Sequence, residues 1–277
     1  MAVNFMRASL SFPFFLVAAL AMGPEGGLGQ VTTARAGWLL LSVVGSYVVG
    51  DALFLSGATL LGVPVALAIA STYPLWSALA GWLFLGQSVG PAGLAGVVLV
   101  VAGVATVVRY RGAGAGDAAR AESPAAGLRN APGHVTGVLL AGATSLFWAL
   151  NTFAIARGGA DLPVAGVNTF RMGFAVALMP LGRLLLGRRG PTLLVPLRDM
   201  RRVWPVFLLE SVGGTALFVV GLTHAPLAVA AALTSLAPVL SVPFAVLIGK
   251  ERIGGRVLLG IVVVTAGIVL LVAFGRA

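Results

Sequence analysis

The chain contains no cysteine and very little charge. Its 277 residues include 18 Lys and Arg and 8 Asp and Glu, so 9% are charged, against roughly 25% in ordinary soluble domains. The absence of cysteine excludes disulfides, thiol catalysis and thiolate metal sites. The only lysine is Lys250, which leaves one amine nucleophile. There is also no P-loop pattern, so we expect no nucleotide-driven pumping by this chain.

Long uncharged runs take the place of the missing charge. Between Gly37 and Val108 the only charged residue is Asp51, and between Val203 and Gly249 it is Glu210. Because one bilayer crossing takes about 20 residues, each run must fold back as several helices. The net charge of +10 does not indicate a nucleic-acid partner, because the basic residues lie in short connections between apolar runs.

The sequence repeats itself at an offset of 164 residues, without gaps over about a hundred positions. Asn, Arg and Pro are scarce in the chain, and all three keep this register. Duplication inside a membrane chain is typical of transporters. The clearest matches are Asn4, Arg7, Gly50, Gly57, Pro74, Gly96 and Gly103 with Asn168, Arg171, Gly214, Gly221, Pro238, Gly260 and Gly267.

Apolar runs bounded by Gly, Pro and Arg predict an all-α, polytopic membrane protein with nine transmembrane helices. Residues 1–109 form the first repeat with four helices, 110–133 a linker, and 134–277 the second repeat with five helices. The predicted helices lie at about 4–22, 37–60, 63–86, 90–109, 134–156, 164–187, 203–223, 226–249 and 254–274.

The first repeat lacks a counterpart of the helix at 134–156, which would lie before Met1. Two explanations are open: the chain lost a helix, or the start of the reading frame was placed too late, which we favour. A basic start at Arg7 and Ala19-Leu20-Ala21 also resemble a signal peptide. However, Asn4 and Arg7 align with an internal helix that no signal peptidase removes, so we expect no cleavage.

Lys and Arg are distributed unequally between the two sides of the membrane. Counting connections alternately gives fourteen on one side and three on the other, which predicts an inside N-terminus and an outside C-terminus for nine helices. A complete unit of five helices is an odd number, so two such units would have opposite topology in the membrane, as inverted repeats.

Two acids lie within predicted helices, Asp51 and Glu210. A carboxylate in hydrocarbon costs about 2.5–3.5 kcal/mol on insertion scales and needs a partner or a watery cavity. The functional interpretation is a proton or cation site; the alternative is a structural ion pair with Arg or a backbone cap. Position 210 corresponds to position 46, five residues before Asp51, so the acids are not equivalent.

An Asn-x-x-Arg pattern occurs in both repeats, as Asn4 with Arg7 and as Asn168 with Arg171. The spacing of three places both side chains on one helix face. Arg171 could bind an anionic substrate group or neutralise Asp51 or Glu210; alternatively, it extends to an interface as a structural residue.

Three further features could line a path. Trp148 and Asn151 share a helix face and either line a cavity or serve packing and interhelical hydrogen bonding. Pro74 and Pro238 fall mid-helix, where proline frees a carbonyl and permits a hinge.

Catalytic patterns are weak. Gly50-Asp51 resembles half of an intramembrane aspartyl protease pattern, but no second acid has the companion context. His134 and His224 stand singly at helix ends without a triad or metal arrangement. We therefore predict no enzyme activity, no metal site and no cofactor.

The order of these motifs resembles that of the EamA family of the drug/metabolite transporter superfamily. The resemblance rests on the Trp148 to Asn151 helix, Asn-x-x-Arg, Ser-x-x-Pro-x-x-Ser and Gly249-Lys250-Glu251. It implies ten helices in two inverted five-helix repeats that export or exchange small metabolites. This chain departs from the pattern in its missing first helix, in Gln87 where the family has an acid, and in its charge count, since the family's C-terminus is usually cytoplasmic.

We therefore expect a secondary transporter in the cell membrane with alternating access around a central site between the repeats. Its partners are the lipid bilayer and a small solute, with proton coupling as one option. A membrane-embedded enzyme and a non-transporting scaffold or sensor are the alternatives. The predicted polar contacts are Asp51, Arg171 and Glu210, with Asn4, Arg7, Trp148, Asn151 and Asn168 along the path.

The charge count predicts that a reporter fused after Ala277 lies outside the cytoplasm. Alkaline phosphatase fused there should be active, and green fluorescent protein fused there should be dark. A fluorescent, phosphatase-inactive C-terminus would contradict the charge count and agree with the family resemblance.

Overall fold

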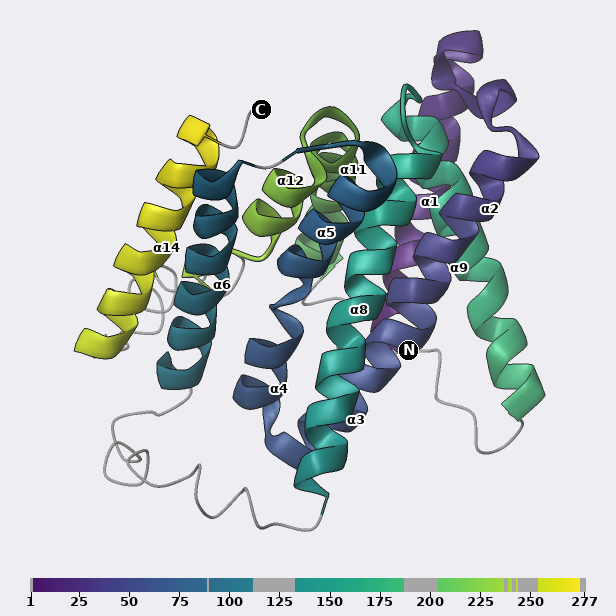
Figure 1. The fold of residues 1–277 in the computed structure, drawn as a ribbon. Helices are drawn as coiled ribbons and strands as arrows, with labels where there is room; N and C mark the ends of the chain where they lie inside the picture. Colours follow the sequence, from purple (N-terminus) through teal and green to yellow (C-terminus); the bar gives the residue numbers. More distant parts are fainter. Residues whose placement is uncertain are drawn as a thin grey trace. The chain divides into compact units, whose positions relative to one another are not determined.

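The computed structural model describes residues 2–88, 90–111, 133–186, 204–236, 239–240, 243 and 254–274. Every element within them is helical (Figure 1). The longer helices are α1 (Ala2–Ala21), α2 (Thr33–Val43), α3 (Asp51–Leu61), α4 (Val63–Ala70), α5 (Tyr73–Leu85), α6 (Pro91–Arg111), α8 (His134–Gly158), α9 (Val164–Leu186), α11 (Thr215–His224), α12 (Leu227–Thr234) and α14 (Gly255–Phe274). The short elements are η1 (Gly23–Gly26), η2 (Leu28–Gln30), η3 (Val44–Gly50) and η5 (Leu209–Gly214).

Six helices in the described part of the chain are long and apolar enough to cross a membrane. Two shorter apolar helices, Pro91–Val107 and Gly255–Leu271, accompany them. The protein is thus a multi-pass membrane protein, as its composition predicts. The six spans are Asn4–Ala21, Thr33–Leu61, Val65–Leu85, His134–Gly158, Val164–Leu181 and Trp204–His224.

The described residues place helix in each of the nine predicted ranges, but the boundaries need correction. The helix predicted from residue 37 begins at Thr33. Thr32 precedes it with extended backbone angles, and its hydroxyl accepts a hydrogen bond from the Arg35 backbone N–H at 3.3 Å. This N-cap satisfies a donor that the first turn leaves unpaired, and prediction from hydropathy alone missed it.

The helix predicted at 63–86 is interrupted. It consists of α4 and α5, separated by Ser71 and Thr72. Pro74 lies in the first turn of α5, where the missing N–H has no intrahelical partner to lose and the ring prevents the preceding turn from continuing. In the second repeat α12 ends at Thr234. Pro238, the other predicted hinge, lies outside the described residues.

The chain forms two compact units. The first consists of Met1–Ala52 and Leu150–Ala225, and the second of Leu53–Ala149 and Pro226–Ala277. Each unit therefore contains helices from both sequence repeats.

In the first unit, α1 packs on α9, its counterpart at the offset of 164. A Cβ atom built at Gly166 would lie 2.7 Å from the Gly26 carbonyl oxygen, and one at Gly173 would lie 3.1 Å from the Phe12 ring. A later residue of α9 therefore contacts an earlier residue of the first segment, so the two helices are antiparallel. Ala8, Phe15, Val43, Tyr47, Met172, Ala175 and Met179 form the buried core around them.

In the second unit, α6 packs along α14 (Figure 1), and these helices are also counterparts at the offset of 164. A Cβ atom on Gly96 would lie 2.8 Å from the Gly267 carbonyl oxygen, and one on Gly103 would lie 2.8 Å from that of Gly260. The glycines let the two backbones touch. Equivalent helices are again antiparallel, which is the relation that inverted repeats require.

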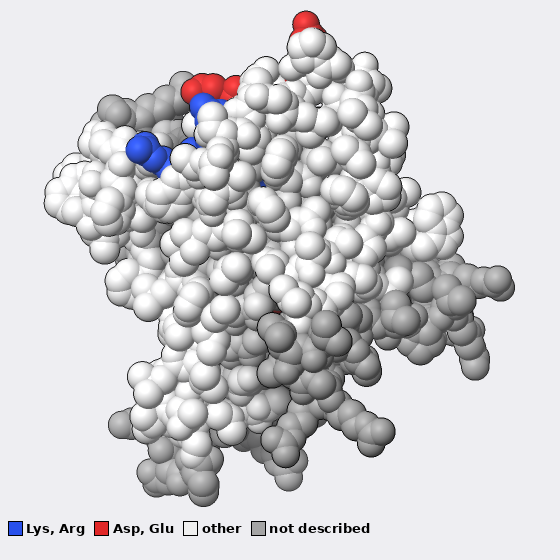
Figure 2. All heavy atoms as spheres, turned by 90° about the vertical axis from the view of Figure 1, so that its right-hand side faces the viewer, with Lys and Arg blue, Asp and Glu red and all other residues white. Residues whose placement is uncertain are grey.

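The surface carries large apolar side chains. Trp82, Phe84 and Leu139 are each at least 60% exposed, and the face drawn in Figure 2 is mostly uncharged among the described residues. A soluble protein with so much exposed apolar surface would associate. In a bilayer these side chains contact lipid tails.

We predict that Gly103→Ala loosens the pairing of α6 with α14. The new Cβ would lie 2.7 Å from the Val264 backbone nitrogen, so backbones must separate, and overpacking of this kind costs about 1–3 kcal/mol. The apparent melting temperature of the detergent-purified protein should fall. Gly142→Ala in α8 of the same unit is the control, since nothing lies within 4 Å of that position. Equal melting temperatures for the two variants would contradict the prediction.

Candidate functional site

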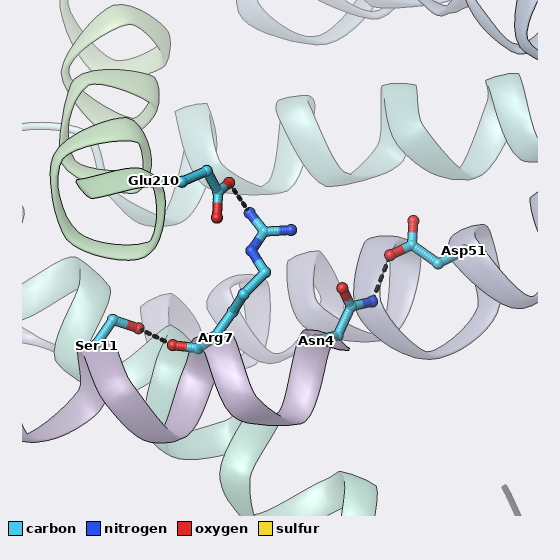
Figure 3. A network of polar contacts seen from close by, with 5 residues as sticks. All are labelled: Asn4, Arg7, Ser11, Asp51 and Glu210. Carbon is cyan, nitrogen blue, oxygen red and sulfur yellow. Dashed lines mark hydrogen bonds and ion pairs between the residues drawn. The ribbon is translucent and has the colours of Figure 1, made fainter. Parts of the chain in front are cut away.

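An ion pair joins the two sequence repeats inside the first unit. The Arg7 guanidinium on α1 donates to the Glu210 carboxylate in η5 (Figure 3). The guanidinium carbon also lies 5.8 Å from the centre of the Tyr47 ring. Relative exposures of 27% for Arg7 and 49% for Glu210 show that the pair is only partly enclosed. The sequence left two interpretations of Glu210, a proton or cation site and an ion pair with Arg. The structure contains an ion pair, and its arginine is Arg7 rather than Arg171.

One helical turn before Arg7, the Asn4 side-chain amide donates to the Asp51 carboxylate (Figure 3). Asn4 is 7% exposed, and Asp51 is the first residue of α3. Ser11, one turn after Arg7, donates its hydroxyl to the Arg7 carbonyl at 2.8 Å. Thus α1 presents Asn4 and Arg7 on one face to two different acids.

Arg171 lies on α9 and is 2% exposed. Its Nε donates to Ser42 Oγ at 3.0 Å, Nη1 to Asn168 Oδ1 at 3.3 Å and Nη2 to Asn151 Oδ1 at 3.4 Å. Asn168 and Arg171 therefore share a face, as their spacing predicts. The three acceptors come from α2, α8 and α9, so this cluster too combines residues of both repeats.

The acids are positioned by π-helical segments that occur at the same place in both repeats. In η3 the Asp51 backbone N–H bonds to the Ser46 carbonyl, and at η5 the Thr215 N–H bonds to the Glu210 carbonyl. Both bonds span five residues, and position 46 corresponds to 210 as 51 does to 215. The wider π turn brings positions five apart nearer to one face than an α-helix does, and such turns are frequent at functional sites.

The asparagines repeat the same relation. Asn4 donates to the Asp51 carboxylate, and Asn168 donates to the backbone carbonyl of Thr215 at 3.5 Å. Both contacts bridge 47 residues, so the two repeats use equivalent positions with different acceptors. At this π turn each repeat has one acid, Asp51 at the end of η3 and Glu210 near the start of η5.

Two buried atoms of the first unit have no hydrogen-bond partner among the described residues. They are Arg7 Nε and Ser211 Oγ, and Ser211 follows Glu210 directly. Buried polar groups without protein partners are usually bound by water or a ligand. The polar cluster therefore has unused hydrogen-bonding capacity beside the ion pair.

Trp148 belongs to the second unit and Asn151 to the first. Trp148 packs against Phe54, with ring centres 5.6 Å apart, and against Tyr73 at 6.1 Å. The Tyr73 hydroxyl bonds to the Ala231 carbonyl at 3.0 Å and to Thr234 Oγ1 at 2.7 Å. In the second unit Trp148 thus lies beside Tyr73, the first residue of α5.

Sequence reasoning missed Ser42, Tyr47 and Gln87. Ser42 lies at the end of α2, and Tyr47 lies five residues later in η3. Both fall within a long apolar run, which gave no sign of a polar role. Gln87 Oε1 accepts a hydrogen bond from the Leu227 backbone N–H at 2.8 Å and so caps the start of α12. The departure from an acid at position 87 pointed to this residue but not to its partner.

An open apolar hollow of about 410 Å³ also lies in the first unit. None of the predicted site residues lines it. Its walls are Phe14, Trp204, Pro205, Leu208, Leu209, Val212 and Gly213.

The apolar helices and the antiparallel pairing of equivalent helices define a class of protein: a helical membrane protein of two inverted repeats. Comparison with known proteins gives the same answer, because the family described as EamA-like transporters matches residues 1–109 and 135–273. The chain belongs to the EamA-like transporter family, which places it among membrane transporters of the drug/metabolite type.

A crystal structure, described only as that of a protein, has the same fold. It is 20% identical with a TM-score of 0.72, and the alignment covers 99% of this chain and 88% of that one. No curated protein sequence matches this chain.

We predict that reversing the ion pair restores what each single reversal removes. Arg7→Glu and Glu210→Arg each place two like charges together, whereas the double variant forms the pair again. Because both side chains are partly exposed, we expect a coupling free energy of roughly 1 kcal/mol in a double-mutant cycle of thermal stability. Arg157→Glu, at an exposed position of the same unit, is the control for charge alone. Strict additivity of the two single variants would count against the pair.

Proposed function

We propose that this protein is a secondary transporter that exports or exchanges small metabolites across the cell membrane. Family membership supports the general class, and the contacts between repeats support the mechanism. The central observation is that Arg7 of the first repeat binds Glu210 of the second, while Arg171 of the second binds Ser42 of the first.

Cross-repeat polar contacts suit alternating access. A transporter of inverted repeats has two states in which one repeat exchanges roles with the other around a fixed site. Contacts between the repeats can be broken in one state and re-formed in the other. We propose that seven polar residues of the first unit line this site: Asn4, Arg7, Asp51, Asn151, Asn168, Arg171 and Glu210. Trp148, in the second unit, stays a predicted path residue.

The acids are the proposed coupling groups. Protonation of Glu210 would remove its charge and weaken its pairing with Arg7. Binding of one proton would therefore release the contact between the two repeats. The unused donors are Arg7 Nε, in the arginine of the ion pair, and Ser211 Oγ, in the residue that follows Glu210. They support a site that water or solute enters. Pro74, at the break between α4 and α5, is the proposed hinge, with Pro238 as its counterpart.

Solute flux tests this proposal. Proteoliposomes with the full chain would be loaded with a mixture of anionic, zwitterionic and neutral metabolites, and the released solutes identified by mass spectrometry. We expect protein-dependent release of a subset of solutes, slowed about tenfold in Glu210→Gln and in Asp51→Asn, corresponding to about 1.4 kcal/mol of barrier.

The exposed variant Arg157→Gln should transport as the wild-type chain does. If folded protein releases no solute of any class, the scaffold or sensor interpretation gains and the transporter proposal falls.

A further inference from the structure

We propose that Arg171 binds the oxyanion, a carboxylate or a phosphate, of the transported solute. The inference rests on the proposed function and names the substrate class of the same site. It follows from a comparison of the two equivalent arginines, Arg7 and Arg171, which differ in their charge partners.

Arg171 is a buried cation with neutral partners. It is 2% exposed, and its three hydrogen-bond acceptors are one hydroxyl and two amide oxygens. None of these three hydrogen-bond partners carries a charge. Among the described residues, the ion pair with an N···O distance of 4.0 Å or less is formed by Arg7 and Glu210, not by Arg171.

The repeat shows which acid is absent. Arg7 binds Glu210, and position 210 corresponds to position 46 in the first repeat, which is Ser46. Ser46 Oγ donates to the Ser42 carbonyl at 3.0 Å, and Ser42 is itself the partner of Arg171. Where the first arginine has a carboxylate, the second therefore has the hydroxyl of Ser42, and the position that corresponds to the carboxylate is Ser46.

The hydrogen bonds of Arg171 can be exchanged for those of an anion. A guanidinium has five N–H donors, and the hydrogen bonds to Ser42, Asn168 and Asn151 use three of them. The contacts with Asn168 and Asn151 are 3.3 and 3.4 Å long, respectively, beyond the usual N–H···O range of about 2.7–3.2 Å. A carboxylate or phosphate would accept two parallel N–H groups and compensate the charge, and such bonds are about twice as strong as neutral ones.

The three neutral partners of Arg171 imply a preference for anionic over neutral solutes. An uncompensated cation inside the protein is costly, so the site favours a solute that brings one negative charge. A neutral isostere would leave that charge unpaired. The amide oxygens of Asn151 and Asn168 hold the guanidinium when the solute is absent, so Arg171 keeps its position for the next one.

Direct binding to the detergent-purified full chain is the first test. The probes are benzoate, inorganic phosphate and the neutral isostere benzamide, and the readout is the shift in melting temperature with concentration. We expect stabilisation by benzoate or phosphate and none by benzamide; which of the two acts assigns carboxylate or phosphate chemistry.

Four variants separate binding from folding. Arg171→Gln should weaken the apparent anion affinity at least about tenfold, and Arg171→Lys should retain part of it. Ser46→Glu supplies the acid that the second repeat has at position 210, and should abolish the response to anions while the protein stays folded. Arg157→Gln should respond as the wild-type chain does.

Stabilisation by benzamide equal to that by benzoate, no response to either anion, or a full response in Ser46→Glu would overturn the inference. The flux measurement separates this failure from failure of the proposed function. If neutral solutes cross and anions do not, transport stands and the anion site falls. If anions cross in the wild type but not in Arg171→Gln or Ser46→Glu, both stand.

Discussion

A charged side chain inside a bilayer must find its partner within the protein, because lipid offers none. This constraint organises the first unit. Arg7 reaches Glu210, Asn4 reaches Asp51, and Arg171 is held by Ser42, Asn151 and Asn168. The helices that carry these groups must pack so that donors and acceptors meet. The polar contacts therefore join segments that lie far apart in the sequence.

Duplication gives the two repeats equivalent positions, and departures from this symmetry give the two arginines different partners. The π turns at η3 and η5 occupy equivalent positions, and the two asparagines bond to equivalent positions. The acids are placed differently, so one arginine has a carboxylate and the other has hydroxyl and amide oxygens. A perfectly symmetric site would satisfy both arginines alike. In the second unit four glycines bring the backbones of α6 and α14 into contact.

Much of the fold could be predicted from the sequence. Long apolar runs and their Gly, Pro and Arg boundaries locate helices, because hydrocarbon admits few other structures. Pro74 indicated an irregularity in this helix. It did not predict that the helix breaks at Ser71 and Thr72, which leaves Pro74 in the first turn of α5. The cap at Thr32 and the π turns were not predicted. Both are defined by hydrogen bonds, and hydropathy along the sequence does not report hydrogen bonds. Glycines at equivalent positions, Gly50 and Gly214, were the sequence feature that marked the place of the two π turns.

The candidate site divides in the same way. The sequence by itself determined the duplication, the Asn-x-x-Arg face and the scarcity of acids, because these follow from residue identity and spacing. Only the tertiary structure decided the partners: Glu210 bonds to Arg7 and not to Arg171, and Asp51 bonds to Asn4. A partner depends on which helices pack together and how a π turn aims a side chain. Neither is encoded in the spacing along one helix.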